Sequence, residues 1–297
     1  MSKTTIAATG FRPVVRIDEE HTRRVDDELV VEDPLEIFVD ESPYALTMRT
    51  PGHDRELVAG FCFTEGLISG IEDIESLDHC PGSLGEKRMF VALRHRRASR
   101  EASLRKRREF ISQSSCGLCG KESLAEVHTE IPPVSGRRRL RAAALPELRK
   151  AMEARQVIFA RTGATHCAAI FAHDRSLLAF AEDVGRHNAL DKAIGQTLLT
   201  RTRDRACLAM VSSRLSYEMI QKAGMLGIEI LCGFSAASRL AVDLAESLNM
   251  TLVGFLRGAR MSVYTGYDRI LTRSGAEDVQ GLLPAAAGAA PHLFQLD

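Results

Sequence analysis

The chain has 297 residues, of which 45% are hydrophobic and 26% are charged, and this composition excludes a mainly disordered protein. Lysine and arginine total 39, as do aspartate and glutamate, so we expect neither a nucleic acid nor a membrane as partner. The sequence shows no signal peptide, no apolar run of about 18 residues and no secreted disulfide pattern among its seven cysteines. We therefore expect a cytoplasmic protein of one or two domains.

The first third of the chain predicts an arm followed by a small domain. Residues 1–32 mix charged residues with few apolar ones, which predicts a flexible arm. Residues 33–110 predict an N-terminal domain that includes an arginine-rich run at 94–108. Its expected elements are the two strands of a hairpin, a helix and a third strand, at residues 35–39, 44–48, 54–68 and 89–93.

Residues 136–270 predict a larger α/β domain, and residues 271–297 predict a disordered tail. The expected strands of the α/β domain lie at 168–171, 177–180, 207–211, 228–231 and 251–256. Its expected helices are one capped by Asp183 and extending to 198, and two more at 217–226 and 238–248. Because the later strands are separated by helical crossovers, we expect a largely parallel sheet with helices on both faces.

Residues 111–135 form a linker that carries the dithiol loop Cys116-Gly117-Leu118-Cys119. A C-x-x-C motif can bind zinc, act in redox or sulfur chemistry, or be incidental. A zinc site needs about two further ligands, and neither a second C-x-x-C nor a histidine pair at finger spacing is present. The zinc deaminase signature also fails, because His128-Thr129-Glu130 follows the cysteines and Ser115 stands where that signature has proline.

Arginine-rich runs flank the dithiol loop on both sides, and nearby positive charge favours the thiolate form of a cysteine. A thiolate can attack a persulfide and keep its outer sulfur, while a second thiol releases or protects that sulfur by exchange. We expect Cys116 to carry the sulfur and Cys119 to assist. A zinc-binding interaction module remains the alternative for this loop.

Polar and basic residues follow three predicted strands of the larger domain. They are Ser212, Ser213 and Arg214 after the first strand, Ser235, Ser238 and Arg239 after the second, and Arg257, Gly258, Ala259 and Arg260 after the third. The carboxyl ends of parallel strands form the ligand crevice of an open α/β sheet, so these residues should converge there. Arginine forks and helix N-termini bind phosphates, which predicts a nucleotide ligand, although the sequence has no Walker loop and no G-x-G-x-x-G motif.

The segment EDVGRHNALDK at 182–192 has two interpretations. His187 can act as a proton carrier with Asp183 nearby. Alternatively, Asp183 caps a helix and His187 merely lies in its first turn. The sequence leaves both open.

Several stretches resemble the formate dehydrogenase accessory sulfurtransferase family, FdhD, over residues 34–270. They are TMRTPG at 47–52, AGFCFTEG at 59–66, SCGLCG at 115–120, GATHC at 163–167, EDVGRHNALDK at 182–192, SSR at 212–214 and GFLRGARMSVYT at 254–265. The resemblance implies an α/β protein with a small N-terminal α/β-roll domain. It also implies a C-terminal domain with a cytidine deaminase-like fold that lacks the zinc site.

The same resemblance implies a sulfurtransferase. It would take sulfur from a cysteine desulfurase and pass it to the bis-guanine-dinucleotide form of the molybdenum cofactor, which formate dehydrogenase requires. By matching position, Cys116 would carry the persulfide. The cofactor, or GDP as its partial mimic, would bind at Phe255, Leu256, Arg257, Gly258, Ala259 and Arg260. The resemblance further implies a homodimer without a structural metal, and the alternative function is a non-catalytic chaperone that only holds the cofactor.

Overall fold

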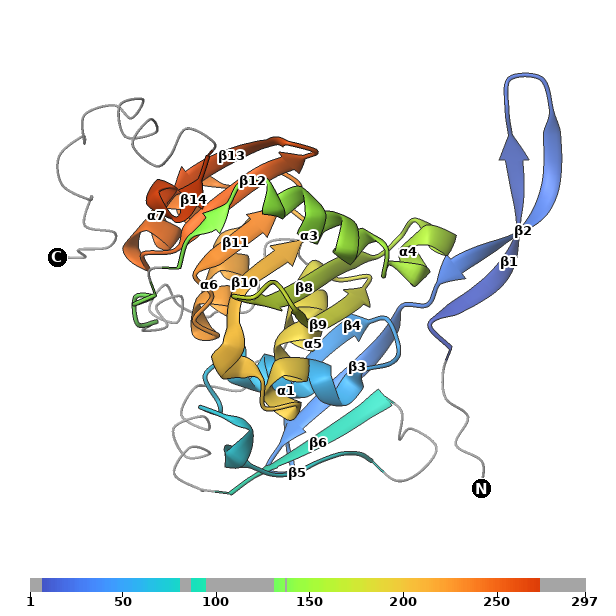
Figure 1. The fold of residues 1–297 in the computed structure, drawn as a ribbon. Helices are drawn as coiled ribbons and strands as arrows, with labels where there is room; N and C mark the ends of the chain where they lie inside the picture. The colour runs from blue at the N-terminus through green and yellow to red at the C-terminus, as the bar shows by residue number, and fades with distance from the viewer. Residues whose placement is uncertain (1–6, 81–86, 95–130, 137, 273–297) are drawn as a thin grey trace, which may run out of the picture.

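The computed structural model describes residues 7–80, 87–94, 131–136 and 138–272. Within them the chain forms a two-stranded hairpin, a four-stranded sheet, a six-stranded sheet and a short pairing of β7, Leu140–Arg141, with β14, Ile270–Leu271 (Figure 1). Helices pack between and around the sheets, so the predicted mixed α/β class is confirmed. The dithiol loop, most of its linker and the predicted tail lie outside the described residues.

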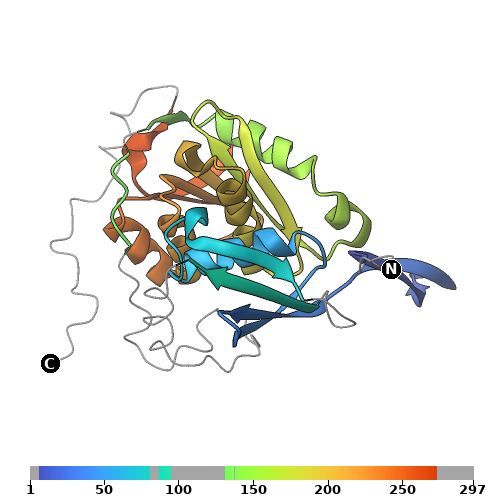
Figure 2. The same cartoon turned by 90° about the horizontal axis from the view of Figure 1, so that it is seen from below.

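A long hairpin projects from the body of the molecule, as two perpendicular views show (Figures 1 and 2). Strands β1, Thr9–Ile17, and β2, Thr22–Val30, pair antiparallel over their whole length. The prediction of a flexible arm over residues 1–32 is therefore wrong for residues 9–30, which form this hairpin. Its many charged side chains predicted a loose segment, but a hairpin with both faces largely in solvent accommodates charges while its backbone groups pair across the strands.

The four strands of the N-terminal sheet have the order β4-β3-β6-β5. They are β3, Asp33–Val39; β4, Ser42–Arg49; β5, Ile74–His79; and β6, Arg88–Leu93. The predicted hairpin and the strand at 89–93 are confirmed. Helix α1, Asp54–Thr64, packs on this sheet and ends before the predicted residue 68. Strand β5 was not predicted, because its two apolar residues, Ile74 and Leu77, are three positions apart and so do not follow the two-residue period of a strand. The pairing of β5 with β6 is irregular between Ile74 and Ser76.

The six-stranded sheet has the order β13-β12-β11-β10-β8-β9. Its strands are β8, His166–Ala172; β9, Leu177–Asp183; β10, Ala206–Val211; β11, Ile230–Gly233; β12, Thr251–Arg257; and β13, Arg260–Thr265. The expectation of a largely parallel sheet is wrong, because only β10–β11 and β11–β12 are parallel pairs. Tight turns join β8 to β9 and β12 to β13, and strands joined in this way must run antiparallel.

Helices cover both faces of this sheet, as expected. On one face lie α5, Arg186–Leu199; α6, Tyr217–Met225; and α7, Arg239–Ser247. On the other lies α3, Ala144–Glu153, followed along the chain by the short α4, Val157–Thr162. Neither α3 nor α4 was predicted. No helix in the described ranges is both long and apolar enough to cross a membrane.

The two halves of the molecule share one apolar core. Helix α1 of the N-terminal half crosses α5 where each helix has a glycine, Gly60 and Gly195. A Cβ atom on Gly60 would overlap the backbone of Asp191, and one on Gly195 would overlap the backbone of Glu56. The two helix backbones therefore touch, and the apolar cluster continues from the N-terminal sheet through α1 to α5 and the larger sheet.

Candidate functional site

One edge of the six-stranded sheet collects the residues that follow its parallel strands. The register pairs Val211 with Gly233 and Cys232 with Val253, so β10, β11 and β12 reach this edge side by side. Strand β8 runs in the opposite direction and begins at the same edge. The predicted binding residues all lie at this strand-end edge: Ser213, Arg214, Ser235, Phe255, Leu256, Arg257, Gly258, Ala259 and Arg260.

The turn between β12 and β13 is the most basic part of the strand-end edge. Gly258 has a φ of 56°, in the left-handed region that favours glycine, and it lets the chain reverse between Arg257 and Arg260. Both arginines are exposed, and neither side chain forms a hydrogen bond or an ion pair with another residue of the described ranges. Phe255 beside them is 41% exposed. Two free guanidinium groups next to an aromatic ring can hold phosphates and stack on a base.

Two open grooves lie against this turn. The first has a volume of about 670 Å³ and includes Phe255, Arg257 and Arg260 in its lining. The second has a volume of about 500 Å³, and Arg257 lines both grooves. Both volumes fall in the range of small-molecule and cofactor sites.

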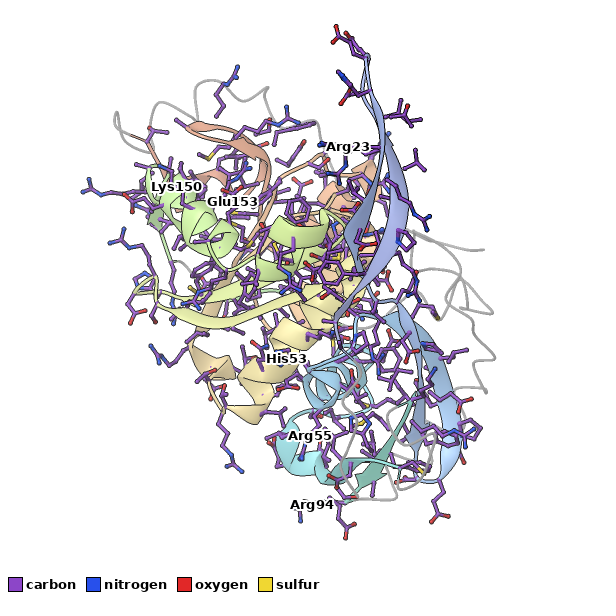
Figure 3. The ribbon with its side chains drawn as sticks, turned by 90° about the vertical axis from the view of Figure 1, so that its right-hand side faces the viewer. Arg23, His53, Arg55, Arg94, Lys150 and Glu153 are labelled. Atoms are coloured by element: carbon purple, nitrogen blue, oxygen red, sulfur yellow. The ribbon has the colours of Figure 1, made fainter. Side chains whose placement is uncertain are left out.

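The second groove adds residues that the sequence did not predict. Arg149 of α3 donates to the backbone oxygen of Leu256, and its guanidinium carbon lies 4.1 Å from the centre of the Phe234 ring. Lys150 and Glu153 of α3 line the same groove, and Figure 3 shows both on this helix. No sequence signal connects α3 with β12, because Arg149 and Leu256 are 107 residues apart and α3 itself was not predicted.

Two of the predicted binding residues cannot act through exposed side chains. Leu256 is fully buried in the core. Ser213 is 5% exposed, and its hydroxyl donates to the backbone oxygen of Arg214. The backbone oxygen of Ser235 accepts from the backbone N–H of Phe255, which ties the end of β11 to β12. Contact between a ligand and Leu256 or Ser213 would therefore involve their backbone atoms.

Asp183, one of the two candidates in the EDVGRHNALDK segment, is a structural residue in this fold. Its carboxylate is fully buried and lies 2.7 Å from the ammonium group of Lys192. It also accepts hydrogen bonds from the backbone N–H groups of Thr50 and Gly185. Gly185, and not Asp183 as predicted, is the N-cap of α5. The carboxylate stabilises the turn before the helix and ties it to the N-terminal half.

His187, the other candidate, lies at the strand-end edge in the first turn of α5. Its Nε2 atom is 2.8 Å from the Oε2 atom of Glu218, in the first turn of α6. The sequence did not predict this contact, because it depends on the packing of α5 against α6. Within the described ranges, no group of three His, Cys, Asp or Glu side chains is arranged to hold a metal ion.

The predicted carriers Cys116 and Cys119 lie outside the described residues, but five other cysteines are described. Four of them are buried: Cys62, Cys167, Cys207 and Cys232. Burial raises the pKa of each of these thiols, to about 12 for Cys62 and Cys167. A buried thiol with a raised pKa is a poor nucleophile. Cys80 is half-buried.

The fold and this edge define a mixed α/β protein with two open grooves against a basic turn. The sequence pattern of the FdhD/NarQ family matches residues 30–271. The chain therefore belongs to the FdhD/NarQ family.

Individual relatives agree with this assignment. The chain is 41% identical over 280 residues to a Streptomyces coelicolor protein named sulfur carrier protein FdhD, with 90% of this chain and 97% of that protein covered. It is 42% identical over 265 residues to a Nocardia farcinica protein of the same name, with 88% and 95% covered. A crystal structure described as a formate dehydrogenase accessory protein from Desulfotalea psychrophila has the same fold, with a TM-score of 0.71 at 23% identity over 89% of this chain and 100% of that one.

Proposed function

We propose that this chain is a sulfur carrier that holds sulfur as a persulfide on Cys116. In this proposal a cysteine desulfurase supplies the sulfur, and the acceptor is the bis-guanine-dinucleotide molybdenum cofactor that formate dehydrogenase requires. Membership of the FdhD/NarQ family and relatives named as sulfur carriers support a role in sulfur transfer. The persulfide, the donor and the acceptor belong to the proposal.

The burial of the described cysteines is the observation that supports Cys116 as the carrier. Four of the seven cysteines are buried with raised thiol pKa values, so they are poor candidates for attack on a donor persulfide. Cys80, Cys116 and Cys119 remain. Only Cys116 and Cys119 are a closely spaced pair between basic runs, where thiolate formation is favoured.

Two thiols allow both loading and release of sulfur. In loading, the thiolate of Cys116 attacks the outer sulfur of the donor persulfide, the donor S–S bond breaks and the donor thiolate leaves. In release, the thiolate of Cys119 attacks the inner sulfur on Cys116. A disulfide forms and hydrosulfide leaves, so the two cysteine sulfurs are oxidised while the transferred sulfur is reduced.

The β12–β13 turn is the proposed binding place for the guanine nucleotide end of the cofactor. The free guanidinium groups of Arg257 and Arg260 supply charge for the phosphates, and Phe255 supplies a surface for stacking. Arg149 and Phe234 line the second groove from the other side. GDP is the simplest probe of this site.

Sulfur loading can be tested with the full chain, a cysteine desulfurase and labelled cysteine. We expect the wild-type protein to gain one labile sulfur atom in a mass spectrum, and Cys116→Ala to gain none. Cys80→Ala is the matched control, because Cys80 is the one described cysteine that is not buried, and this variant should load like the wild type. Equal loading of Cys116→Ala and the wild type would refute the persulfide assignment.

The two alternative functions predict different results. A non-catalytic chaperone would still support formate dehydrogenase activity in a cell when both Cys116 and Cys119 are replaced by alanine. A zinc-binding interaction module would contain stoichiometric zinc that is lost in Cys119→Ala. The sulfur carrier predicts loss of formate dehydrogenase activity in the double variant and no stoichiometric zinc in the purified wild-type protein.

We also propose that a second copy of the chain covers the β1–β2 hairpin. Of the seven large apolar side chains exposed in the described ranges, all but Phe255 lie on this hairpin or on α4. They are Phe11, Val15, Ile17, Leu29, Val157 and Phe159. Arg161 of α4 forms an ion pair with Glu28 of β2 and so holds the two surfaces together. Phe11, Val15 and Ile17 share one face of the hairpin, and exposed apolar surface of this kind marks an interface that a second copy, with the same surface, can cover.

Light scattering on the purified protein tests the proposed dimer. The wild type should have the mass of two chains, and the double variant Phe11→Ser, Ile17→Ser should have the mass of one. Arg23→Ser, on the same hairpin, is the control and should remain dimeric. A monomeric wild type, or a double variant that still dimerises, would contradict the proposal.

A further inference from the structure

A pair of ionisable side chains at the strand-end edge lies outside the two grooves. The Nε2 atom of His187 and the Oε2 atom of Glu218 are 2.8 Å apart, and the two side chains are 20% and 13% exposed. His166, at the start of β8, is close enough for its charge to interact with His187. The Nδ1 atom of His166 is 3.4 Å from the hydroxyl of Ser212, which follows β10. Three ionisable groups from α5, α6 and β8 therefore meet where the strands end.

Buried charges hold this pair in place. Asp191 lies one helical turn after His187, and Lys222 lies one turn after Glu218. The ammonium nitrogen of Lys222 is 2.8 Å from Oδ2 of Asp191 and 3.0 Å from the hydroxyl of Thr64. A second ion pair between the same two helices restricts their sliding, so the contact between His187 and Glu218 is preorganised.

The two histidines have different surroundings. Burial lowers the pKa of His166, and charge interactions with Arg186 and with His187 lower it further. His166 is therefore neutral near neutral pH. The Nε2 atom of His187 lies 2.8 Å from the Glu218 carboxylate and forms no hydrogen bond within the described residues, so the carboxylate places a negative charge beside the ring. His187 is the histidine placed to deliver a proton.

The pair of His187 and Glu218 lies within reach of a ligand that binds at the β12–β13 turn and extends along the strand-end edge. In the order β8-β10-β11-β12, three strand spacings separate β8 from β12, which is about 14 Å. A nucleotide-containing ligand bound by Arg257 and Arg260 can reach over that distance along the edge. Its nucleotide end would lie at the turn, and its reactive end would lie near His187.

We propose that His187, with the carboxylate of Glu218 beside it, donates a proton to the oxygen atom that leaves the acceptor when sulfur enters. This inference rests on the proposed function, in which hydrosulfide reaches the molybdenum cofactor as substrate. Hydrosulfide forms a metal–sulfur bond, and a metal–oxygen bond breaks. The hydrogen of hydrosulfide and the proton from His187 leave with the oxygen as water. Sulfide replaces oxide, so the metal keeps its oxidation state, His187 becomes neutral and Glu218 remains a carboxylate.

The experiment uses full-length protein loaded with labelled sulfur and follows the transfer of label to the isolated bis-guanine-dinucleotide molybdenum cofactor. We expect His187→Gln to slow transfer by about 100-fold or more, which is the range for loss of a general acid. Glu218→Gln, which keeps the shape of the side chain, should slow transfer by a smaller factor. Both variants should load sulfur and bind GDP within twofold of the wild type. His173→Gln, in the exposed turn between β8 and β9, is the control and should behave like the wild type.

Two further measurements separate proton transfer from a structural role. The rate of transfer by the wild-type protein should depend on pH, and His187→Gln should lack this dependence. Added imidazole should restore part of the rate of His187→Ala, because it can replace the missing proton donor. Other charged groups also face this site: Arg186 and Asp191 on α5, Glu218 and Lys222 on α6, His166 on β8 and Asp183 at the end of β9. His166→Gln is therefore measured in parallel and should retain the wild-type pH dependence.

Different failures identify which proposal is wrong. Transfer by His187→Gln at the wild-type rate would overturn the role of His187 and leave the sulfur carrier proposal standing. A slow His187→Ala variant that imidazole does not restore, with a wild-type pH dependence, would also overturn it, because the loss would then be structural. A wild-type protein that does not load sulfur would overturn the sulfur carrier proposal and the present one with it.

Discussion

The charged residues between α1, α5 and α6 and those at the β12–β13 turn are of the same chemical types but have opposite surroundings. Asp191 and Lys222 are buried, and each finds its partners within the protein. Arg257 and Arg260 are exposed and make no side-chain hydrogen bond or ion pair within the described part of the chain. A buried charge that has its partners within the protein stabilises the fold. An exposed charge without such partners is available to bind a ligand.

The buried side of this comparison predicts the largest effect. Burial by itself lowers the pKa of Lys222, but the carboxylates of Asp191, Glu65 and Glu218 outweigh burial and raise that pKa. Replacing Lys222 by methionine leaves a buried carboxylate without its partner, which costs about 3 to 5 kcal/mol. Guanidinium unfolding should show this loss.

Lys150→Met is the control for Lys222→Met, because Lys150 is exposed on α3, and it should change the free energy of unfolding by less than about 0.5 kcal/mol. The double variant Lys222→Met, Asp191→Leu should recover part of the loss, because both charges are then absent. Similar stabilities for Lys222→Met and Lys150→Met would show that the buried pair does not stabilise the fold.

Helix α1 contacts these buried charges, because the Thr64 hydroxyl donates to Asp191 and accepts from Lys222. Its close contact with α5 predicts the next largest effect. In Gly195→Ala the new methyl group would overlap the backbone of Glu56, and the helices would have to separate. We expect a loss of about 1 to 3 kcal/mol in the free energy of unfolding, as for other overpacked cores. Gly10→Ala, where the added Cβ would have no atom within 4 Å, should lose less than about 0.5 kcal/mol. A neutral Gly195→Ala would contradict the observed packing.

The exposed side of the comparison predicts a loss of binding without a loss of stability. Arg257→Ala removes one free guanidinium group and should weaken GDP binding by roughly tenfold, the value of about one charge-assisted hydrogen bond. Its unfolding midpoint should stay at the wild-type value. Arg205→Ala is the control, because Arg205 is 56% exposed and directly precedes β10, at the end of that strand away from the β12–β13 turn. Calorimetric titration with GDP distinguishes the two, and equal affinities would remove the turn from the site.

The buried thiols predict the smallest effect, on the pH dependence of stability. The pKa of Cys62 is raised from 9.0 to about 12, mainly by burial. The unfolded thiol ionises first as pH rises, so the contribution of Cys62 to stability is complete below about pH 9 and is lost between there and about pH 12. Between pH 8 and 10 the wild type should lose about 1 kcal/mol more than Cys62→Ala. Cys80→Ala should follow the wild type, and identical slopes for all three would contradict the burial of this thiol.

Local sequence patterns predicted the elements that have strong local signals. The strands at 35–39 and 207–211 and the helix at 217–226 lie where their apolar spacing placed them. Ser238 is the N-cap of α7, and its hydroxyl accepts from the backbone N–H of Ala241. These features depend on a residue and its near neighbours, which a sequence displays directly.

The errors occurred where distant contacts decide the structure. The β1–β2 hairpin carries many charges, and its register comes from pairing between two strands that are both rich in them. The edge strand β13 alternates exposed and half-buried residues, so it had no clear apolar pattern. Helix α3 is amphipathic, but its role in the second groove depends on a contact with β12 across more than a hundred residues.

The sequence by itself determined the family, the dithiol pair with its basic surroundings and the position of the polar residues at the strand ends, because each is a property of short stretches of chain. Only the tertiary structure decided which charges are available. It buried Asp183 against Lys192 while leaving Arg257 exposed, and it placed His187 against Glu218. The reason is that burial and ion pairing depend on the packing of helices and strands far apart in the chain, whereas the identity of a side chain does not.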